Sequence, residues 1–367
     1  MRVAYFVDSS DAVNWGGQAT SAGMRHLVAT SYPHATFLPL KFGALPFRHA
    51  TFLRALLEHA VLWAVRARHD AWLMRLLRWY GVDTRLLSQF DVVCFNGEGA
   101  IHQRSGHFFR LLGLLQAFKR AGVRVYALNQ TVDVDTSGGR HAELLQRVYP
   151  GLDRVAVREP VSWRVLQRLG ISSELVGDAA YALPRLSQAE LAARAARFNL
   201  PQGFIGITAT SAMKRNAASL AKMRRLMTEL AATGRPLVFL ANTKTDLYLA
   251  ERLSHGRTLR VIDYTQADYL DAMAVIASAT LVVGGRQHPN IFAAKYGVPF
   301  IGLAGNTHKM AGVVELLNYP VPALSWDHAD GELTGWARRL LNREISLDAV
   351  TVPVIDRIDL GGAEAGR

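Results

Sequence analysis

Short apolar runs rich in β-branched residues alternate along the chain with longer stretches of helical periodicity. The runs that predict strands fall into two groups: 2–7, 91–95, 123–128, 155–158 and 174–176, and then 204–209, 237–241, 259–262, 281–283 and 300–303. In the second group a helical pattern fills each gap. This alternation predicts an α/β fold of βαβ units, with mostly parallel sheets and helices on both faces.

A stretch rich in turn residues, 177–184, separates the two groups of strands. Its composition is typical of a domain boundary. We therefore expect an N-terminal Rossmann-like domain at 1–183, a C-terminal one at 184–330, and a helix with a tail at 331–367. The N-terminal domain would carry residues 52–80 as a helical insertion.

The segment 52–80 combines leucine, tryptophan and arginine in a helical pattern. A basic helix that carries tryptophan can lie in a membrane interface, with its arginines on lipid phosphates. The charged side chains nevertheless spread around most of the helical wheel. That spread also suits a pair of core helices whose long arginine side chains reach solvent. The sequence leaves both interpretations open.

Composition and charge narrow the class of protein. The chain has 367 residues, of which 50% are hydrophobic and 20% charged, so a disordered chain or a small disulfide module is excluded. Forty-two Lys and Arg against 30 Asp and Glu leave a net charge of +12, which favours an acidic ligand or a polyanionic surface. No nucleic-acid recognition motif or lysine-rich arm accompanies that charge, so we expect no nucleic-acid partner.

The chain contains a single cysteine, Cys94. One cysteine excludes a disulfide within the chain and a cysteine-rich metal site, and it is typical of a reducing cytoplasm. No apolar run reaches the length of about 20 residues that a transmembrane helix needs, and the N-terminal run is too short for a signal peptide. We expect a cytoplasmic protein, peripheral at the inner face of the membrane if 52–80 binds lipid.

Two glycine-containing loops in the N-terminal half follow predicted strands. Ligands of open α/β sheets bind outside the carboxyl ends of strands, where glycines allow close approach and helix N-termini attract anions. The residues of interest are Asn14, Gly16, Gly17 and Gln18 in the first loop, and Gly97, Glu98, Gly99 and His102 in the second. Glu98 and His102 would form a hydroxyl-binding pair or a general base with its partner. Ordinary turns and surface polarity would use the same residue types.

Two further loops place arginine at the end of a strand. Arg158 precedes Pro160, which suits the start of a helix, and its guanidinium could bind phosphate or carboxylate as a fork, or a neighbouring glutamate. Arg286 and His288 follow two glycines and begin a predicted helix. This second loop combines an anion-binding group with a proton donor, which makes it the sharpest local signal in the chain.

In this order the motifs resemble the polysaccharide pyruvyl transferase family, over about residues 1–320. The C-terminal half carries most of the resemblance, in Asp268-Tyr269, Arg286-Gln287-His288, the segment 296–302 and Lys309. The N-terminal half adds the loops around Gly16 and Gly97 and the segments 157–162 and 176–178. The resemblance implies a GT-B-like fold with two Rossmann-like domains facing a cleft.

Members of this family transfer an enolpyruvyl unit from phosphoenolpyruvate to a sugar, where it forms a pyruvate ketal. The resemblance therefore implies phosphoenolpyruvate as co-substrate, a saccharide or lipid-linked saccharide as acceptor, and a role in cell-envelope or exopolysaccharide biosynthesis. His288 would be the proton donor or base, with Arg286 and Glu98 as further catalytic groups. The donor would lie on Arg158, Arg286, Gln287 and Lys309. The acceptor would lie on Asn14, Gly16, Gly17, Gln18, Gly97, Glu98, Gly99 and His102.

Phosphoenolpyruvate chemistry is consistent with these residues. Protonation of the enol carbon creates an electrophilic centre for a sugar hydroxyl, and a cationic clamp stabilises the departing phosphate. An imidazole can move either proton near neutral pH. None of these steps needs a metal, so we expect neither a metal nor a resident cofactor.

Two positions differ from the usual family pattern and leave other functions open. Glu98 stands between two glycines where a third glycine is usual, and Gln287 stands where an aliphatic residue is common. A GT-B glycosyltransferase could use Glu98 or His102 as base and the Arg286 loop to bind the diphosphate of a nucleotide sugar. A non-catalytic carbohydrate-binding partner in an envelope biosynthetic complex is the third hypothesis.

Overall fold

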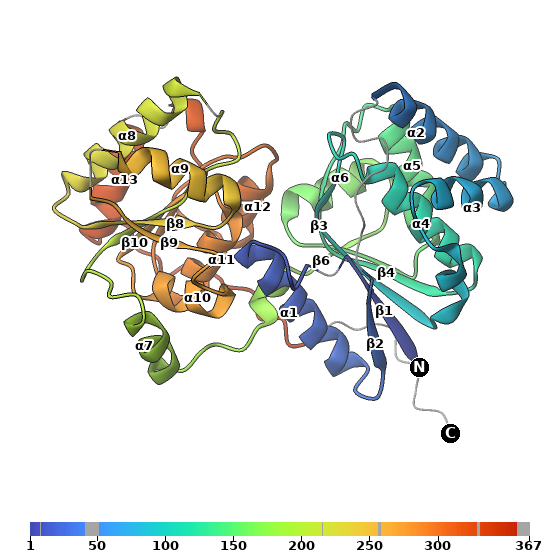
Figure 1. Cartoon of the computed structure of the whole chain (residues 1–367), viewed down its shortest axis with the longest axis horizontal. Coiled ribbons are helices and arrows are strands. Elements are labelled where there is room, and N and C mark those ends of the chain that lie inside the picture. The colour runs from blue at the N-terminus through green and yellow to red at the C-terminus, as the bar shows by residue number, and fades with distance from the viewer. Residues whose placement is uncertain (8, 41–50, 215, 256–257, 329–330, 358–367) are drawn as a thin grey trace. The chain divides into compact units, whose positions relative to one another are not determined.

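The computed structural model describes residues 1–7, 9–40, 51–214, 216–255, 258–328 and 331–357 (Figure 1). The chain forms two compact units. Unit 1 comprises Met1–Ser9, Met24–Ala182 and the C-terminal segment from Ile355, and unit 2 comprises Ser10–Gly23 and Leu183–Val354. Helix α1 (Trp15–Ser31) thus gives its first turns to unit 2 and the remainder to unit 1.

These units group the chain differently from the predicted domains near both ends of the chain. The N-terminal segment Ser10–Gly23 belongs to unit 2, although sequence order assigned it to the domain 1–183. Residues 331–354 also belong to unit 2, where their helix packs on the sheet. Both differences arise from contacts distant in sequence, such as those that Trp15 makes with residues after position 240.

Unit 1 is built on a six-stranded parallel sheet, in the order β2-β1-β3-β4-β5-β6. Its strands are β1 (Arg2–Phe6), β2 (Thr36–Leu40), β3 (Val92–His102), β4 (Arg124–Asp133), β5 (Arg154–Val157) and β6 (Glu174–Leu175). The sequence pattern missed β2, which contains Pro39. Proline has no amide hydrogen for a ladder and is therefore confined to edge strands, and β2 is an edge strand.

Strand β3 extends further than predicted and includes the expected Gly97-Glu98-Gly99 loop. The register with β4 shifts between Glu98 and Ile101, so the glycine segment is an irregular part of the strand and not a loop after it. A Cβ atom on Gly97 would lie 2.5 Å from Gln130 Cβ of β4. The glycine therefore lets the two strands stay paired where a side chain would separate them.

Helices cover the sheet of unit 1 and supply its core. They are α2 (Thr51–Arg66), α3 (Asp70–Trp79), α4 (Phe108–Arg120), α5 (Arg140–Val148) and α6 (Pro160–Arg168). Helices α2 and α3 form the segment 52–80 and pack against α4 (Figure 1). A Cβ atom on Gly113 of α4 would lie 3.1 Å from Val61 and 3.5 Å from Leu73, so the glycine lets both helices approach closely.

Unit 2 is built on a five-stranded parallel sheet, in the order β11-β10-β7-β8-β9. Its strands are β7 (Ile205–Ile207), β8 (Leu237–Ala241), β9 (Arg260–Asp263), β10 (Leu281–Gly284) and β11 (Phe300–Gly302). Strands β7 and β10 are fully buried, as parallel strands between two helical layers should be. Every strand predicted from the sequence overlaps an observed one, so the predicted α/β fold with parallel sheets is confirmed.

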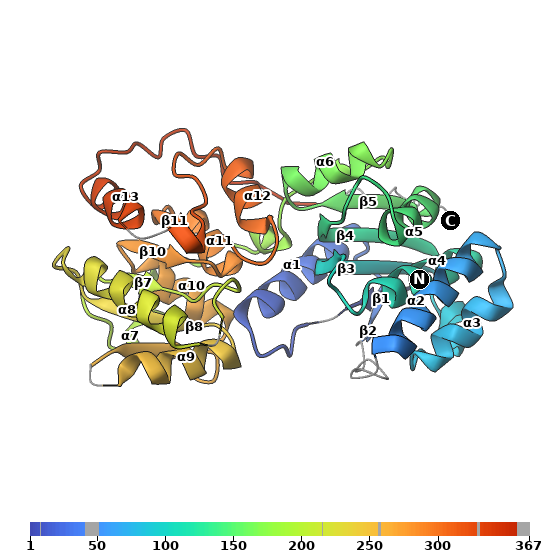
Figure 2. The ribbon, with the colours of Figure 1, turned by 90° about the horizontal axis from the view of Figure 1, so that it is seen from above.

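Helices lie on both faces of the sheet of unit 2, with α8 and α9 on one face and α10 on the other (Figures 1 and 2). The helices are α7 (Gln188–Ala196), α8 (Ala217–Ala231), α9 (Lys244–Ser254), α10 (Tyr269–Ala277), α11 (Gln287–Tyr296), α12 (Lys309–Leu316) and α13 (Glu332–Leu341). Helix α11 follows β10 directly and ends at Gly297, whose φ of 72° is left-handed. Its first turn therefore lies at the carboxyl end of the sheet.

Candidate functional site

Each sheet has a switch point, at which two neighbouring strands are followed by strands on opposite sides. In unit 1 it lies between β1 and β3, and in unit 2 between β7 and β10. Ligands of open α/β sheets bind outside the carboxyl ends of strands at such points. The candidate residues of β3 and those after β10 therefore lie at the points where sheets of this kind usually bind ligands.

Two glycines after Val283 bring the chain close to the end of β7. A Cβ atom on Gly284, which has a φ of 155°, would lie 2.0 Å from Thr208 Oγ1, and one on Gly285 would lie 2.3 Å from Thr210 Cβ. No side chain fits in either place. The pair places Arg286 at the switch point, where its backbone N–H donates to Thr208 Oγ1 at 3.3 Å.

The guanidinium of Arg286 is held by a carboxylate that no sequence motif indicated. Its Nε and Nη2 donate to the carboxylate oxygens of Asp246 at 3.1 and 2.5 Å. The Asp246 side chain, in the first turn of α9, is fully buried, whereas 21% of the Arg286 side chain is exposed. A bidentate pair fixes the plane of a guanidinium. Arg286 is therefore pre-oriented, with Nη1 outside the pair.

His288 lies in the first turn of α11, packed against the N-terminal turn of α1. A Cβ atom on Gly16 would lie 2.0 Å from His288 Nδ1, so only glycine fits beside the imidazole as it stands. Trp15 anchors this turn of α1, because its backbone N–H donates to Asn242 Oδ1 at 2.9 Å and its indole N–H to the Ala267 carbonyl at 2.8 Å. The position of His288 thus depends on a helix from the other end of the chain.

The predicted loop at 14–18 is mainly the first turn of α1. Asn14 Oδ1 accepts from the Gly17 N–H at 2.6 Å, and Gln18 Oε1 accepts from the Tyr269 N–H at 3.1 Å. These residues were expected on the acceptor side, in the N-terminal domain. The structure groups them instead with Arg286 and His288 in unit 2.

Gln287 and Lys309 are the remaining donor candidates of unit 2. Gln287 begins α11 and is buried, and its Nε2 has no hydrogen-bond partner among the described residues. A buried amide without a partner is costly and calls for a ligand or water. Lys309 begins α12 and is half-buried.

Glu98 lies at the switch point of unit 1. Its Oε1 accepts from Ser9 Oγ at 2.5 Å and from Asn96 Nδ2 at 3.0 Å, and Asn129 Nδ2 donates in turn to Asn96 Oδ1 at 2.8 Å. Both Glu98 and Asn129 have positive φ angles, 40° and 49°. Such backbone angles cost energy in residues other than glycine and concentrate at functional sites. The carboxylate is therefore held in a fixed orientation at the carboxyl end of the sheet.

Arg158 follows β5 and is part of a buried ion pair. Its Nη1 donates to Asp178 Oδ2 and its Nε to Thr131 Oγ1, both at 2.9 Å. Only 2% of each side chain of the Arg158–Asp178 pair is exposed. Arg158 Nη2 lies toward β3, since a Cβ atom on Gly99 would be 3.9 Å from it. Arg158 thus contacts the glycine segment that carries Glu98.

His102 ends β3 opposite Asp133 of β4, and its Nδ1 accepts from the Arg104 N–H at 3.3 Å. Nearby, the ring of His141 packs on that of Phe108, with 4.7 Å between ring centroids. Burial lowers the pKa of His141 to about 4, with smaller contributions from the charges of Arg140 and His102. His141 is therefore neutral in the folded protein at neutral pH.

Several residues that hold these clusters were not predicted as site residues, among them Ser9, Asn129, Asp178 and Asp246. Asp178 stands in a Val-Gly-Asp motif that supported the family resemblance, and its place after a short strand was a usable signal. Asp246 offers none, because its position in a helix becomes significant only when α9 packs beside the start of α11. The described residues contain no group of three or more His, Cys, Asp or Glu side chains that could hold a metal ion.

Comparison with solved structures identifies the fold as GT-B-like, as predicted. The UDP-GlcNAc 2-epimerase of Methanocaldococcus jannaschii, in complex with UDP-GlcNAc and UDP, has a TM-score of 0.60 at 13% identity, covering 97% of this chain and 96% of that chain. A putative UDP-N-acetylglucosamine 2-epimerase of Listeria monocytogenes has a TM-score of 0.57 at 12% identity, covering 97% and 92%. The α,α-trehalose 6-phosphate synthase of Burkholderia multivorans has a TM-score of 0.52 at 11% identity, covering 95% and 91%.

Comparison by sequence identifies the family. No curated protein sequence is significantly similar to the chain. The family model for polysaccharide pyruvyl transferases, however, matches residues 26–307, which is well over half of the chain. The match includes Glu98, Arg158, Arg286 and His288, and it begins after Gly16. The protein is therefore a transferase, and it belongs to the polysaccharide pyruvyl transferase family.

Proposed function

We propose that the protein transfers the enolpyruvyl unit of phosphoenolpyruvate to hydroxyl groups of a saccharide. The observation that carries the proposal is that Arg286, the N-cap of α11, and His288, in the first turn of that helix, both lie at the switch point of unit 2. A pre-oriented guanidinium and an imidazole at the same helix N-terminus suit a small donor that carries a phosphate and a carboxylate and must be protonated. Family membership supports the same chemistry.

The proposed reaction assigns each group a defined task. A proton adds to the methylene carbon of phosphoenolpyruvate, and a sugar hydroxyl oxygen attacks the neighbouring carbon and loses its own proton. The bond to phosphate then breaks, and a second hydroxyl closes the ketal. Of the two hydroxyl protons, one balances the new methyl group and the other leaves with inorganic phosphate. His288 would donate the proton to the methylene carbon or accept the proton of a hydroxyl, and Arg286 would stabilise charge on the phosphate or carboxylate.

The other candidate residues keep supporting roles in the proposal. Gln287 and Lys309 would bind the donor in unit 2, whereas Arg158, whose side chain is only 2% exposed, would hold the Gly99 segment of unit 1 in place. Glu98 would bind or deprotonate an acceptor hydroxyl, beside Gly97, Gly99 and His102. The turn from Asn14 to Gln18 would shape the acceptor side while it holds His288. The proposal includes neither a metal nor a resident cofactor.

For the acceptor we propose a saccharide or lipid-linked saccharide of cell-envelope or exopolysaccharide biosynthesis. The reaction would take place in the cytoplasm, at the inner face of the membrane when the acceptor is lipid-linked. Phosphoenolpyruvate is a cytoplasmic metabolite, so this location brings donor and acceptor together.

Release of inorganic phosphate tests the donor and the roles of the two residues. With phosphoenolpyruvate and a panel of saccharides, the full chain should release phosphate only when an acceptor is present. Loss of an electrostatic group of this kind costs about 100- to 1,000-fold in kcat, so Arg286→Ala and His288→Ala should reduce release at least that far. His26→Ala, on the exposed side of α1, is the matched control and should retain full activity. Unchanged release by both site variants would contradict the assignment.

A nucleotide-sugar donor is the alternative, and one comparison favours it. The epimerase structure of the same fold contains UDP-GlcNAc and UDP, and the Arg286 loop could bind a diphosphate. Thermal shift distinguishes the two donors: phosphoenolpyruvate should raise the melting temperature and UDP-GlcNAc should not. The reverse result would replace the pyruvyl proposal by a glycosyltransferase. A shift with saccharide alone, without turnover of either donor, would indicate a carbohydrate-binding partner.

A further inference from the structure

The outer surface of α2 and α3 exposes a concentration of large apolar side chains. Thirteen large hydrophobic residues are exposed in the part of the chain that the structure describes, and six of them lie on these two helices: Phe52, Leu53, Leu56, Trp63, Trp72 and Trp79. Phe52 is 77% exposed and Trp79 59%. Apolar residues so concentrated on one helical hairpin mark a binding surface.

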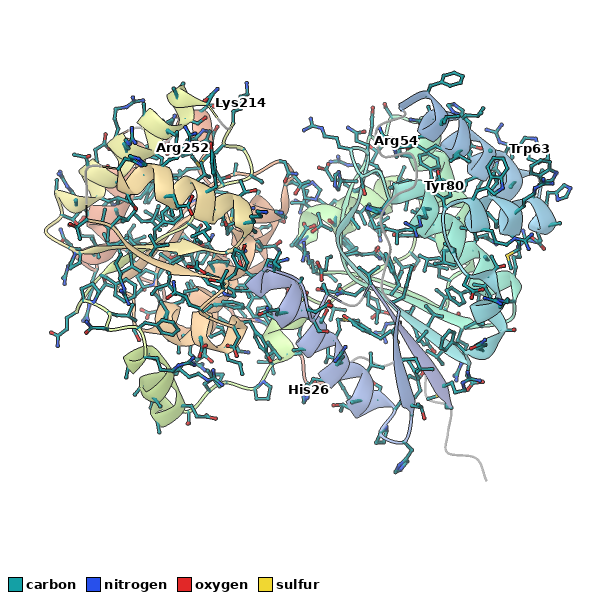
Figure 3. All side chains as sticks on the ribbon, viewed as in Figure 1. His26, Arg54, Trp63, Tyr80, Lys214 and Arg252 are labelled. Carbon is teal, nitrogen blue, oxygen red and sulfur yellow. The ribbon has the colours of Figure 1, made fainter. Side chains whose placement is uncertain are left out.

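These side chains are ordered by helical geometry. On α2, Phe52, Leu56 and Trp63 share a stripe with the exposed His59, at steps of three and four residues. The opposite stripe of α2 and the buried leucines of α3 pack on α4 around Gly113. Figure 3 shows Trp63 pointing outward from the unit. The apolar side chains therefore face away from the core that holds the hairpin.

Positive charge lies next to the apolar side chains of α3. Arg68, Arg75 and Arg78 are exposed, and no carboxylate forms a salt bridge with any of them among the described residues. Arg75 lies over the ring of Trp72, with its guanidinium carbon 5.6 Å from the ring centroid. The surface thus carries unneutralised cations next to aromatic rings.

The two acidic residues of these helices are already paired. Glu58 is buried and forms ion pairs with Arg54 at 3.5 Å and with Arg140 at 2.8 Å. Asp70 lies 3.4 Å from Arg120 of α4. The carboxylates therefore do not offset the charge of Arg68, Arg75 and Arg78, and the face is complementary to an anionic surface.

We infer that the outer face of α2 and α3 binds an anionic lipid bilayer. Tryptophan and phenylalanine enter the interface between headgroups and acyl chains, while long arginine side chains reach the phosphates. No described helix is long and apolar enough to span a membrane, so the hairpin lies in the plane of the interface. Binding by this face requires neither phosphoenolpyruvate nor an acceptor.

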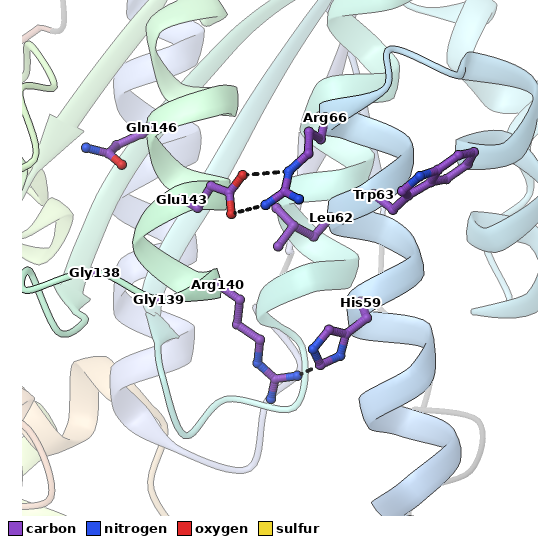
Figure 4. Close-up of a pocket in the computed structure, with 9 residues that line it drawn as sticks. All are labelled: His59, Leu62, Trp63, Arg66, Gly138, Gly139, Arg140, Glu143 and Gln146. Carbon is purple, nitrogen blue, oxygen red and sulfur yellow. Dashed lines mark hydrogen bonds and ion pairs between the residues drawn. The ribbon is translucent and has the colours of Figure 1, made fainter.

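A pocket of about 520 Å³ opens beside this face, between α2 and α5 (Figure 4). Its cations are paired within the protein: Arg66 with Glu143 at 2.6 Å, and Arg140 with Glu58. Trp63 points away from the Arg66–Glu143 pair in the same view. Lipid attraction therefore arises from the exposed arginines of α3 and the preceding turn, and not from this pocket.

Co-sedimentation of the full chain with vesicles tests the inference. The chain should bind vesicles made of phosphatidylcholine and phosphatidylglycerol in equal parts. It should not bind vesicles made only of phosphatidylcholine. Replacing Arg68, Arg75 and Arg78 by glutamine together should weaken binding about 100-fold, since each surface cation contributes severalfold. Replacing Phe52, Trp72 and Trp79 by serine together should also abolish binding, and should remove most of the blue shift in tryptophan emission that vesicles cause in the unaltered chain.

Matched controls separate this face from net charge and from tryptophan content. Replacing the exposed Arg338, Arg339 and Arg343 of unit 2 by glutamine changes the charge equally and should leave binding intact, as should Trp163→Ser. If the two sets of arginine replacements weaken vesicle binding equally, binding depends only on net charge and the inference is overturned. So would a chain that ignores anionic vesicles, or one whose face variants instead dissociate a dimer in light scattering.

Discussion

Both units hold an arginine against a buried aspartate near the carboxyl end of a parallel sheet, but the two ion pairs differ in their exposure to solvent. In unit 1, Arg158 and Asp178 are each only 2% exposed. In unit 2, Asp246 is fully buried while Arg286 keeps 21% of its side chain exposed. The same residue types thus occur in a closed pair and in an open one.

The difference in exposure separates two uses of an arginine at a sheet edge. In a closed pair both ions have lost their hydration. Removing either partner therefore leaves the other as an unpaired charge in the protein interior. An open pair lets the guanidinium add a ligand on its solvent side while the carboxylate keeps it oriented. Arg286 therefore combines orientation with access, whereas Arg158 mainly joins β5, the Asp178 turn and the Gly99 segment.

Removal of each arginine should reveal the largest difference between the two pairs. Arg158→Leu leaves Asp178 as an unpaired buried charge, which should lower the free energy of unfolding of unit 1 by about 3–5 kcal/mol. Arg286→Leu leaves Asp246 next to an opening that water can enter, so the loss should be smaller, about 1–3 kcal/mol. Hydrogen exchange of peptides from each unit, measured in increasing urea, reports the two values separately. Equal losses in the two units would contradict the distinction between closed and open pairs.

Acid should sharpen the comparison, because unit 1 also buries a neutral histidine. The pKa of His141 lies at about 4 in the folded chain, below its ordinary value of 6.5, chiefly through burial. Between these values the unfolded chain binds a proton that the folded chain does not, so stability is complete above pH 6.5 and is lost as pH falls toward 4. The loss should reach at most about 3.5 kcal/mol, since each unit of separation between the two pKa values corresponds to about 1.4 kcal/mol.

Urea titrations at pH 7 and pH 5 measure this loss. His141→Gln should weaken the acid dependence of unit 1, while His26→Gln, an exposed histidine of the same unit, should leave it unchanged. An acid dependence that survives in the His141 variant would assign the effect to other groups. In unit 2, burial lowers the pKa of Lys295 to about 8, so its contribution to stability rises with pH between about 8 and 10.5 and is separable from that of His141.

The fold and part of the site could be predicted from the sequence, for identifiable physical reasons. Parallel strands buried on both faces produce continuous apolar runs, and these located ten of the strands. Arg286 and His288 were accessible because they follow such a strand and two glycines. Strand β2 was missed because Pro39 is tolerated only at an edge, and edges are defined by the assembled sheet.

The partners of these residues could not be predicted, because they lie far away in sequence. Nothing near Arg286 indicates that Asp246, forty residues earlier, neutralises it. Nothing near Trp15 indicates that it docks on Asn242 and Ala267. The local sequence pattern identifies which side chains lie at the end of a strand. Tertiary packing decides whether such a side chain is buried in an ion pair, keeps access to solvent, or is held in place by another element.

The contact between Gly16 and His288 offers a further test in unit 2, which contains the open ion pair. The Cβ atom of Gly16→Ala would overlap the imidazole at Nδ1, but a histidine ring can rotate away, so unfolding should become easier by only about 1 kcal/mol. The imidazole would then lie about 1 Å or more from its position, and a displacement of that size can cost about 100-fold in rate.

We therefore expect Gly16→Ala to lose phosphate release while its melting temperature stays nearly unchanged. Gly335→Ala is the matched control, because it is also a helical glycine of unit 2 but its Cβ would meet open space; it should keep full activity. If Gly16→Ala retains activity, the imidazole does not need the position that α1 enforces, and the first turn of α1 supports unit 2 without serving His288. If it loses activity and stability together, the glycine is required for folding, and the proposed positioning role is wrong.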